Sequence, residues 1–325
     1  MQIAMPKFLN RDWNAAKSRF RKNMLGSREK NGFLLNVVMY TLLISIGFVY
    51  LYPLFHMLAV SFMEPADLLD SSVQWIPRSI HLENYRLAMI TMDFWDSLWK
   101  NVQVAFFPTV LQLLSTAMAG YAFARYDFPL KKLWLAILIF TFVIPPQITM
   151  IPTFVLYHML GILGSLTAFT LPAALGQGFN SAIFILIFYN FHRQVPPSLI
   201  EAAEIDGAGH VSSFFRISMP LAMPAIIVTA LFSFVWYWNE TYLVNLFLGF
   251  GNSRDEGLTT LLLELTRFEQ QYTGSLSAAG ISPDPLNEGM RMSGTMLAIA
   301  PLLVLYLMLQ RHFVESVDKA GITGE

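Results

Sequence analysis

The sequence predicts an all-α integral membrane protein with six transmembrane helices. The chain of 325 residues is 55% hydrophobic and only 13% charged, and its mean hydropathy is +0.50. Its charges are also unevenly placed, because five long stretches contain no Asp, Glu, Lys or Arg. About 20 apolar residues cross a bilayer as a helix, so stretches of this length predict membrane spans.

The charge-free stretches define the spans in order along the chain. Four of them are predicted to hold one helix each. The stretch 133–192 is too long for one span and is predicted to hold two, divided near Gly161 and Gly164. The predicted spans are 33–62, 101–124, 133–157, 166–192, 217–245 and 292–312.

The distribution of Lys and Arg predicts the orientation of these spans. If the amino terminus is cytoplasmic, the inner segments hold 15 of the 21 basic residues, and the outer segments, 64–100 and 240–291, hold six. Positive residues favour the cytoplasmic side, so both termini are predicted to be cytoplasmic. The inner segments are 1–30, 125–132, 193–216 and 311–325.

The first 32 residues form a basic arm with eight basic and two acidic residues. Five apolar residues recur in it at near-helical spacing, which predicts an amphipathic helix on the inner membrane surface. A disordered positive arm is the alternative. At the other end, 316–325 is predicted to be a cytoplasmic tail. The five apolar residues are Leu9, Trp13, Ala16, Phe20 and Met24.

A polar and acidic stretch, 196–220, separates two apolar segments. Ser198 and Glu201 have the spacing of a capping box, and the acidic residues nearby suit the positive end of a helix dipole. Two prolines before them and Gly207 and Gly209 after them delimit a helix of roughly eight residues. Isolated helices below ~12–15 residues are unstable in water, so this one needs support from this chain or another protein.

No catalytic constellation is apparent. The chain has no cysteine and no Gly-Lys dipeptide, so a phosphate-binding loop is absent, and His-Glu-x-x-His and Gly-x-Ser-x-Gly motifs do not occur. The six histidines are scattered and are predicted to pack or lie at interfaces rather than bind metal. We therefore predict no catalytic residue, no metal site and no cofactor in this chain, so any nucleotide hydrolysis must come from a partner.

The polar stretch resembles the EAA signature of ABC importer permeases. Their pattern is Glu-Ala-Ala-x3-Gly-x9-Ile-x-Leu-Pro, and this chain departs from it only at Met219. The matching residues are Glu201, Ala202, Ala203, Gly207, Ile217 and Pro220. Between about residues 35 and 315, further positions resemble the maltose-type carbohydrate branch of this family. They are Asn101, Gly120-Tyr121-Ala122-Phe123-Ala124-Arg125, Ile144-Pro145, Ile151-Pro152, Trp238-Asn239 and Gln310-Arg311.

The resemblance implies a type I importer permease fold in a bacterial inner membrane, with a cytoplasmic coupling helix seated in a groove of an ATPase subunit. In this family the alanines allow close approach, Glu201 pairs with a basic residue of the ATPase, and Gly207 lets the chain turn. The alternative is that Glu201 only caps its own helix. The implied coupling residues are Ser198, Glu201, Ala202, Ala203, Asp206 and Gly207.

The resemblance also implies the partners of the chain. They are two ABC ATPase subunits that bind ATP and Mg²⁺, a second homologous permease, an extracytoplasmic solute-binding protein and a sugar or oligosaccharide, with no nucleic acid. A secondary transporter or a channel subunit without an ATPase is the alternative. The spans carry almost no charge, which disfavours ion coupling.

Polar residues at membrane depth predict the substrate pathway. The fourth span is interrupted by Pro172, Gly176 and Gly178, and polar side chains beside such breaks are tolerated where they line a cavity. A packing kink is the alternative. Trp238 next to a polar pair suits a sugar, although Trp also populates membrane interfaces. The predicted pathway residues are Gln177, Asn180, Ser181, Asn239 and Glu240.

The predicted extracytoplasmic loop, 251–291, is longer than is common in this family. It contains a short apolar run at 261–265 that predicts a helix. Docking of the binding protein is the hypothesis for this loop, and a solvated insertion without function is the alternative. The enlarged loop and the chain length resemble permeases that import acidic oligosaccharides such as alginate.

Overall fold

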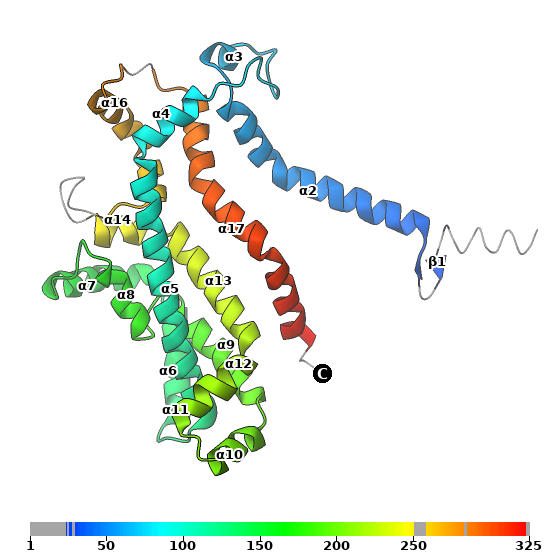
Figure 1. The fold of residues 1–325 in the computed structure, drawn as a ribbon, viewed down its shortest axis with the longest axis vertical. Coiled ribbons are helices and arrows are strands. Elements are labelled where there is room, and N and C mark those ends of the chain that lie inside the picture. The colour runs from blue at the N-terminus through cyan, green and yellow to red at the C-terminus, as the bar shows by residue number, and fades with distance from the viewer. Residues whose placement is uncertain (1–23, 25, 28–29, 250–257, 283–284, 323–325) are drawn as a thin grey trace, which may run out of the picture. The chain divides into compact units, whose positions relative to one another are not determined.

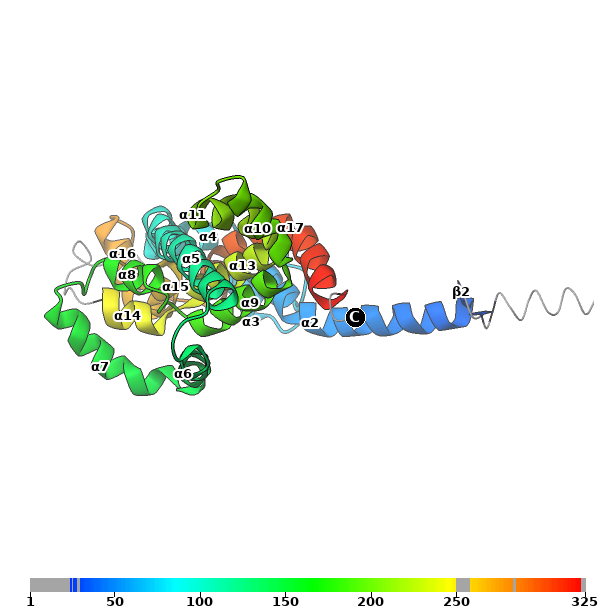
Figure 2. The same cartoon turned by 90° about the horizontal axis from the view of Figure 1, so that it is seen from below.

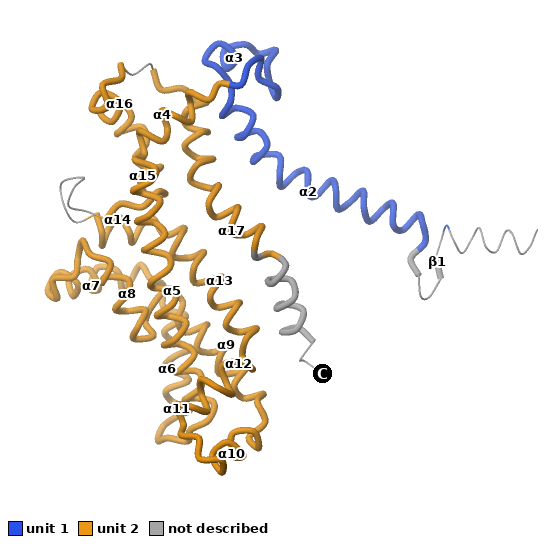
Figure 3. Tube along the Cα trace, in the orientation of Figure 1, with its two compact units in different colours: residues 1–80 blue, residues 81–325 orange. Residues whose placement is uncertain are grey.

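A computed structural model describes residues 24, 26–27, 30–249, 258–282 and 285–322, and most of them are helical (Figure 1). Among the described residues, the strands are β1 (Gly26–Ser27) and β2 (Lys30–Asn31), which pair antiparallel. The predicted all-α fold class is therefore confirmed. The chain divides into two compact units, residues 1–80 and 81–325 (Figure 3).

The first unit is built on α2 (Phe33–Ser61), which covers the first predicted span. None of its most apolar 18-residue window is buried, as expected for a helix that faces lipid. Of the predicted amphipathic arm, Leu9, Trp13, Ala16 and Phe20 lie outside the described residues.

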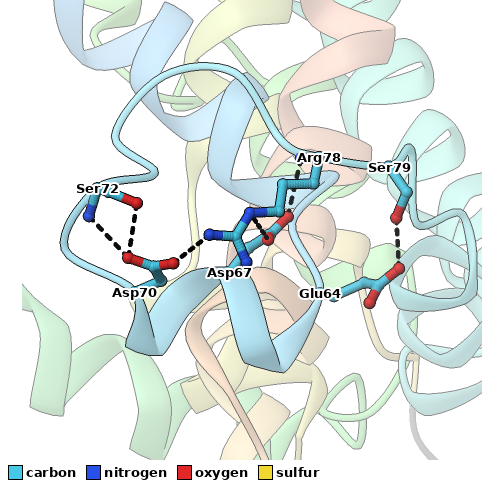
Figure 4. A network of polar contacts seen from close by, with 6 residues as sticks. All are labelled: Glu64, Asp67, Asp70, Ser72, Arg78 and Ser79. Carbon is cyan, nitrogen blue, oxygen red and sulfur yellow. Dashed lines mark hydrogen bonds and ion pairs between the residues drawn. The ribbon is translucent and has the colours of Figure 1, made fainter.

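The short helix α3 (Pro65–Leu69) follows α2, and polar contacts hold the loop after α3 against it (Figure 4). Arg78 forms ion pairs with Asp67 and Asp70, and its backbone N–H donates to Asp67 Oδ2 at 3.0 Å. Hydrogen bonds from Ser72 and Arg78 lower the pKa of Asp70. These contacts close the segment between residues 64 and 79 on itself.

The second unit is organised around α5 (Phe94–Arg125), an uninterrupted helix of 32 residues that includes the second predicted span. It packs against α8 (Thr167–Ala174), α9 (Ser181–Gln194) and α13 (Met223–Asn239) (Figures 1 and 2). Because these helices converge on α5, buried residues concentrate along its length.

The third predicted span, 133–157, is not one straight helix. It consists of α6 (Lys131–Val143) and α7 (Pro146–Met159), which meet at 98°. Pro145 has no N–H to donate and biases Ile144 toward extended backbone, which Ile144 adopts with φ −70° and ψ 121°. The two helices therefore turn along the edge of the bundle (Figure 2).

The fourth and fifth predicted spans are also interrupted. The fourth, 166–192, is split into α8 and α9 by the nonhelical residues 175–180. In the fifth, 217–245, the apolar helix α13 begins only at Met223. It follows α11 (His210–Ser213), the π-helix η1 (Phe214–Ser218) and α12 (Met219–Leu221) across an 81° bend. The helix α14 (Tyr242–Leu248) then starts separately.

These breaks explain how the predicted spans compare with the structure. In the described part of the chain, three helices are long and apolar enough to cross a membrane, and five qualify if each bent pair is one span. The pair α8 and α9, which covers the fourth predicted span, is not among these five, so the sixth span stays a prediction. Hydropathy detected every apolar segment, but it carries no information on the direction that the chain takes after a proline or glycine.

The far end of the second unit is formed by α4 (Glu83–Thr91), α15 (Leu261–Thr266), α16 (Phe268–Ala278) and the start of α17 (Glu288–Ile322). Leu261, Phe268 and Leu276 are buried against α4 and α17 residues in one apolar cluster. The described part of the 251–291 segment is therefore packed rather than solvated. Helix α17 also continues through most of the predicted tail, to Ile322.

Candidate coupling surface and substrate cavity

The helix α10 (Pro197–Ile205) occupies the polar stretch between the fourth and fifth predicted spans. Pro197 is its first residue, a position that suits the fixed φ and missing N–H of proline. Ser198 is therefore inside the helix, and no side chain caps the amino end. The predicted capping box is wrong, because the helix starts at Pro197, two residues earlier than a cap at Ser198 requires. The first turn also contains no acidic residue.

The carboxyl end of α10 closes on Gly207, whose φ of +84° lies in the left-handed region. The Gly207 N–H donates to Glu204 O at 3.0 Å, and the Ala208 N–H donates to Ala203 O at 2.8 Å. These two bonds form a Schellman motif, which satisfies carbonyl groups at a helix end and reverses the chain direction. The stop that the sequence predicted at this glycine is therefore present.

The side chains of α10 are solvent-exposed or only partly covered. No residue of α10 is buried, and Glu201 and Ala202 are exposed. Glu201 makes no hydrogen bond or ion pair within the described residues, so its carboxylate is not used as a helix cap. Apolar side chains lie alongside, with Ile205 86% and Val211 72% exposed. A helix this short needs external packing for stability.

Buried polar contacts connect the α10 segment to the helix bundle. The Arg125 guanidinium, at the end of α5, donates to the carbonyl of Val195, just before α10. Buried His192 on α9 contacts the Ser218 hydroxyl at 2.8 Å through Nδ1. The π-helix that holds Ser218 therefore shares a contact with α9, and π-helices often occur at functional positions. The sequence prediction missed these residues, although Arg125 is the first charge after the second span.

A cavity of about 960 Å³ lies between the bent pair α6–α7, the break between α8 and α9, and the ends of α13 and α14. All five predicted pathway residues line it. Gln177 and Asn180 are exposed, whereas Ser181 is only 4% exposed. The described lining contains amide, hydroxyl and aromatic groups, and its one charged residue is Glu240. The predicted pathway residues are Gln177, Asn180, Ser181, Asn239 and Glu240.

The carboxyl end of α13 shows which neighbouring side chains face the cavity. Trp238 is 4% exposed and stacks on Phe234, so it belongs to the packed core and not to the lining. The aromatic lining at this end comes instead from Trp236, Tyr237 and Tyr242. The hypothesis that Trp238 faces a sugar is therefore not supported. One Glu240 oxygen accepts from the N–H at position 243, which holds that carboxylate at the start of α14.

The comparisons with known proteins fit this arrangement. Residues 112–319 match the family model "Binding-protein-dependent transport system inner membrane component". The chain belongs to this family. The match covers well over half of this permease, from the middle of α5 to the tail, and includes both the α10 surface and the cavity break. The predicted assignment to the inner-membrane permeases of ABC importers is confirmed.

Relatives of this permease match over most of their lengths. It is 28% identical over 291 residues to the polygalacturonan/rhamnogalacturonan transport system permease protein YtcP of Bacillus subtilis, with 90% of this chain and 99% of YtcP covered. It is 26% identical to the arabinooligosaccharides transport system permease protein AraQ of Halalkalibacterium halodurans, with 86% and 93% covered.

One solved structure shares the fold. It is a bacterial ABC transporter involved in the import of the acidic polysaccharide alginate, and its matched chain has a TM-score of 0.70 at 22% sequence identity. The match covers 88% of this permease and 98% of that chain. Most of this permease therefore shares the fold of that chain.

Proposed function

We propose that this permease forms half of the translocation pathway of an ATP-driven oligosaccharide importer and that α10 couples it to an ATPase. The observation that carries the proposal is the exposed α10 surface. It combines an unpaired Glu201 carboxylate, small alanines and exposed Ile205 and Val211 on a helix too short to be stable alone. A groove on a cytoplasmic ATPase subunit satisfies all of these features.

Transport proceeds by alternating access in this proposal. Two ATPase subunits bind ATP and Mg²⁺, and their closure moves α10 and its counterpart on a second, homologous permease. The Arg125–Val195 and His192–Ser218 contacts carry that movement to α5 and α9. The cavity then opens alternately to each side of the membrane, and an extracytoplasmic binding protein delivers the substrate.

The cavity lining supports a sugar as the substrate. Amide side chains and aromatic rings in one cavity match the hydroxyl groups and apolar ring faces of carbohydrates. The names of the relatives include arabinooligosaccharides and rhamnogalacturonan, and the solved structure imports alginate. The lining residues of this chain include no Lys, Arg or His, so an acidic oligosaccharide would have to meet its positive charges on the second permease.

In this proposal both termini and α10 lie in the cytoplasm, and the excess of Lys and Arg on that side supports this orientation. The α15–α16 segment then faces outward, where docking of the binding protein is the natural role for it. Its buried face supports it as a rigid platform, because Leu261, Phe268 and Leu276 fasten it to the bundle.

The substitution Glu201→Lys tests the coupling role. We expect normal membrane insertion, loss of uptake and about tenfold less co-purified ATPase, because a positive charge would meet the basic partner that Glu201 pairs with. Immunoblotting measures insertion and pull-down measures the ATPase. Glu269→Lys, which reverses an exposed charge on α16, is the matched control and should retain the ATPase. Normal uptake by Glu201→Lys would contradict the proposal.

The energy source separates this function from a secondary transporter. Uptake should be inhibited by orthovanadate, which blocks ABC ATPases, and should resist proton uncouplers. The purified complex should also contain an ATPase with the phosphate-binding loop that this chain lacks. Uptake that stops with the uncoupler and persists with orthovanadate would favour the secondary transporter.

A further inference from the structure

Gln112 is a fully buried polar residue in the middle of α5. Its Nε2 donates to Phe179 O at 2.6 Å and to Ser181 Oγ at 2.9 Å. Its Oε1 accepts a hydrogen bond from Ser233 Oγ at 2.9 Å. One side chain therefore joins three segments distant in sequence: α5, the break between α8 and α9, and α13.

The break packs directly against this side chain. The Tyr237 hydroxyl accepts from the Phe179 N–H at 3.3 Å, and the two rings stack with centroids 4.5 Å apart. A Cβ added to Gly178 would lie 2.5 Å from the Tyr237 oxygen and 3.0 Å from the Gln112 side chain. The backbone at Gly178 therefore packs so closely against Gln112 and Tyr237 that a side chain at this position would clash with them. We call Gln112, Ser181, Ser233 and Tyr237 the Gln112 clamp.

The clamp contacts the break between α8 and α9, which contains left-handed backbone. Gly176 has φ +72°, and Asn180, which is not glycine, has φ +53°. Left-handed backbone at a non-glycine residue persists only where the surroundings hold it. Gln177 and Asn180, on this same piece, line the cavity together with the clamp residues Ser181 and Tyr237.

We propose that Gln112 is a positioning residue for substrate binding: it fixes the break so that Gln177 and Asn180 present their amides to the sugar. It does not line the cavity itself. The inference rests on the proposed function, because it assumes that this cavity receives the substrate. A glutamine that served packing alone would affect assembly and all activities together, whereas a positioning residue affects binding selectively.

The test compares Gln112→Met with Thr116→Val. Methionine keeps the length and volume of glutamine but forms none of the three bonds. Thr116 is equally buried on the same helix, but its hydroxyl bonds only within α5, so its loss should not disturb the break. Both variants are assembled with the ATPase, the second permease and the binding protein in proteoliposomes.

Thiol labelling reports the position of the break without knowledge of the sugar. The chain has no native cysteine, so Asn180→Cys introduces a single reactive site in this subunit. With the methanethiosulfonate reagent MTSET, we expect Gln112→Met to change the labelling rate by about fivefold or more, because its three neutral hydrogen bonds are lost. Thr116→Val should stay within about twofold of the parent.

The kinetic measurement uses arabinotriose, raffinose and digalacturonate, and follows whichever stimulates the parent ATPase most. Gln112→Met should raise the half-saturating sugar concentration about fivefold and leave sugar-free ATPase within about twofold. If none of the three sugars stimulates the parent, the proposed sugar class fails, while the labelling experiment still decides the role of Gln112.

Two results would overturn the inference. Either Gln112→Met labels and titrates like Thr116→Val, or it lowers sugar-free ATPase and assembly in the same proportion as stimulated activity. Ser233→Ala removes only the bond to Oε1 and serves where Gln112→Met does not assemble. It should shift the labelling rate in the same direction by a smaller amount, and an unchanged rate would also overturn the inference.

Discussion

The close approach of α5 and α9 depends on the absence of one side chain. A Cβ at Gly120 would lie 2.5 Å from Phe188 Cβ, 2.8 Å from Tyr189 N and 2.9 Å from Ile185 O. Two of these three neighbours are backbone atoms, which cannot move without shifting the whole helix. Small residues at such crossings are typical of membrane helix pairs. Because α9 leads directly to α10, this contact also fixes the base of the α10 surface.

The substitution Gly120→Ala tests this contact. We expect the permease to lose about 1–3 kcal/mol of stability, because the added methyl group overpacks the α5–α9 interface. Thermal unfolding of the purified protein in detergent measures the change. Gly47→Ala on α2 is the control, because nothing lies within 4 Å of its added Cβ, and it should be neutral or slightly stabilising. Equal unfolding temperatures for the two variants would contradict the prediction.

For single residues, the sequence indicates which side chains are unusual for a membrane span, but it does not show toward which face each side chain points. Gln177 and Asn180 stand out as amides in an apolar span, and both line the cavity. Trp238 and Trp236 are two positions apart on α13 and point to different faces. The Trp238-Asn239 motif therefore suggested Trp238 as the ring beside the substrate, whereas Trp236 lines the cavity. Gln112 is visible in the sequence as a polar residue in the second predicted span. Its role could not be inferred, because its three hydrogen-bond partners are distant in sequence.

At the scale of elements, α10 shows which sequence features determine where a helix starts and ends. The two glycines after it predicted its end, and Gly207 forms that end. Its start was misplaced because Pro197 occupies the first position and leaves no role for Ser198 as a cap. The misplaced start has a functional consequence. The Glu201 carboxylate is not needed by its own helix and remains available for a partner.

The substitution Gly207→Ala tests the shape of the α10 end. Alanine in left-handed backbone costs about 1–2 kcal/mol, so the Schellman turn should open and α10 should meet the ATPase at a different angle. We expect normal membrane insertion with uptake reduced severalfold. Gly209→Ala is the matched control, because its φ of −74° suits any residue and nothing lies within 4 Å of its added Cβ. A similar loss of uptake in both variants would show that the turn conformation is not what matters.

At the scale of the whole molecule, the second unit places its two specialised surfaces at opposite ends. The α10 surface lies at one end, and α4 and α16 lie at the other, with α5, α9 and α13 between them (Figure 1). Hydropathy predicted this order of apolar segments. It could not predict the bends at Pro145 and before Met223, because they depend on local backbone geometry. Ile144 and Pro146, on either side of the first bend, line the cavity.

The orientation of these ends can be tested by labelling, since the chain contains no native cysteine. Asp206→Cys places a thiol at the exposed end of α10, and Thr273→Cys places one on the exposed face of α16. The excess of Lys and Arg on the α10 side should hold that end in the cytoplasm. A membrane-impermeant maleimide should therefore label Thr273→Cys in intact spheroplasts and Asp206→Cys only after lysis. The reverse pattern would put α10 beyond the reach of any ATPase, and the coupling role could not stand whatever the shape of the helix.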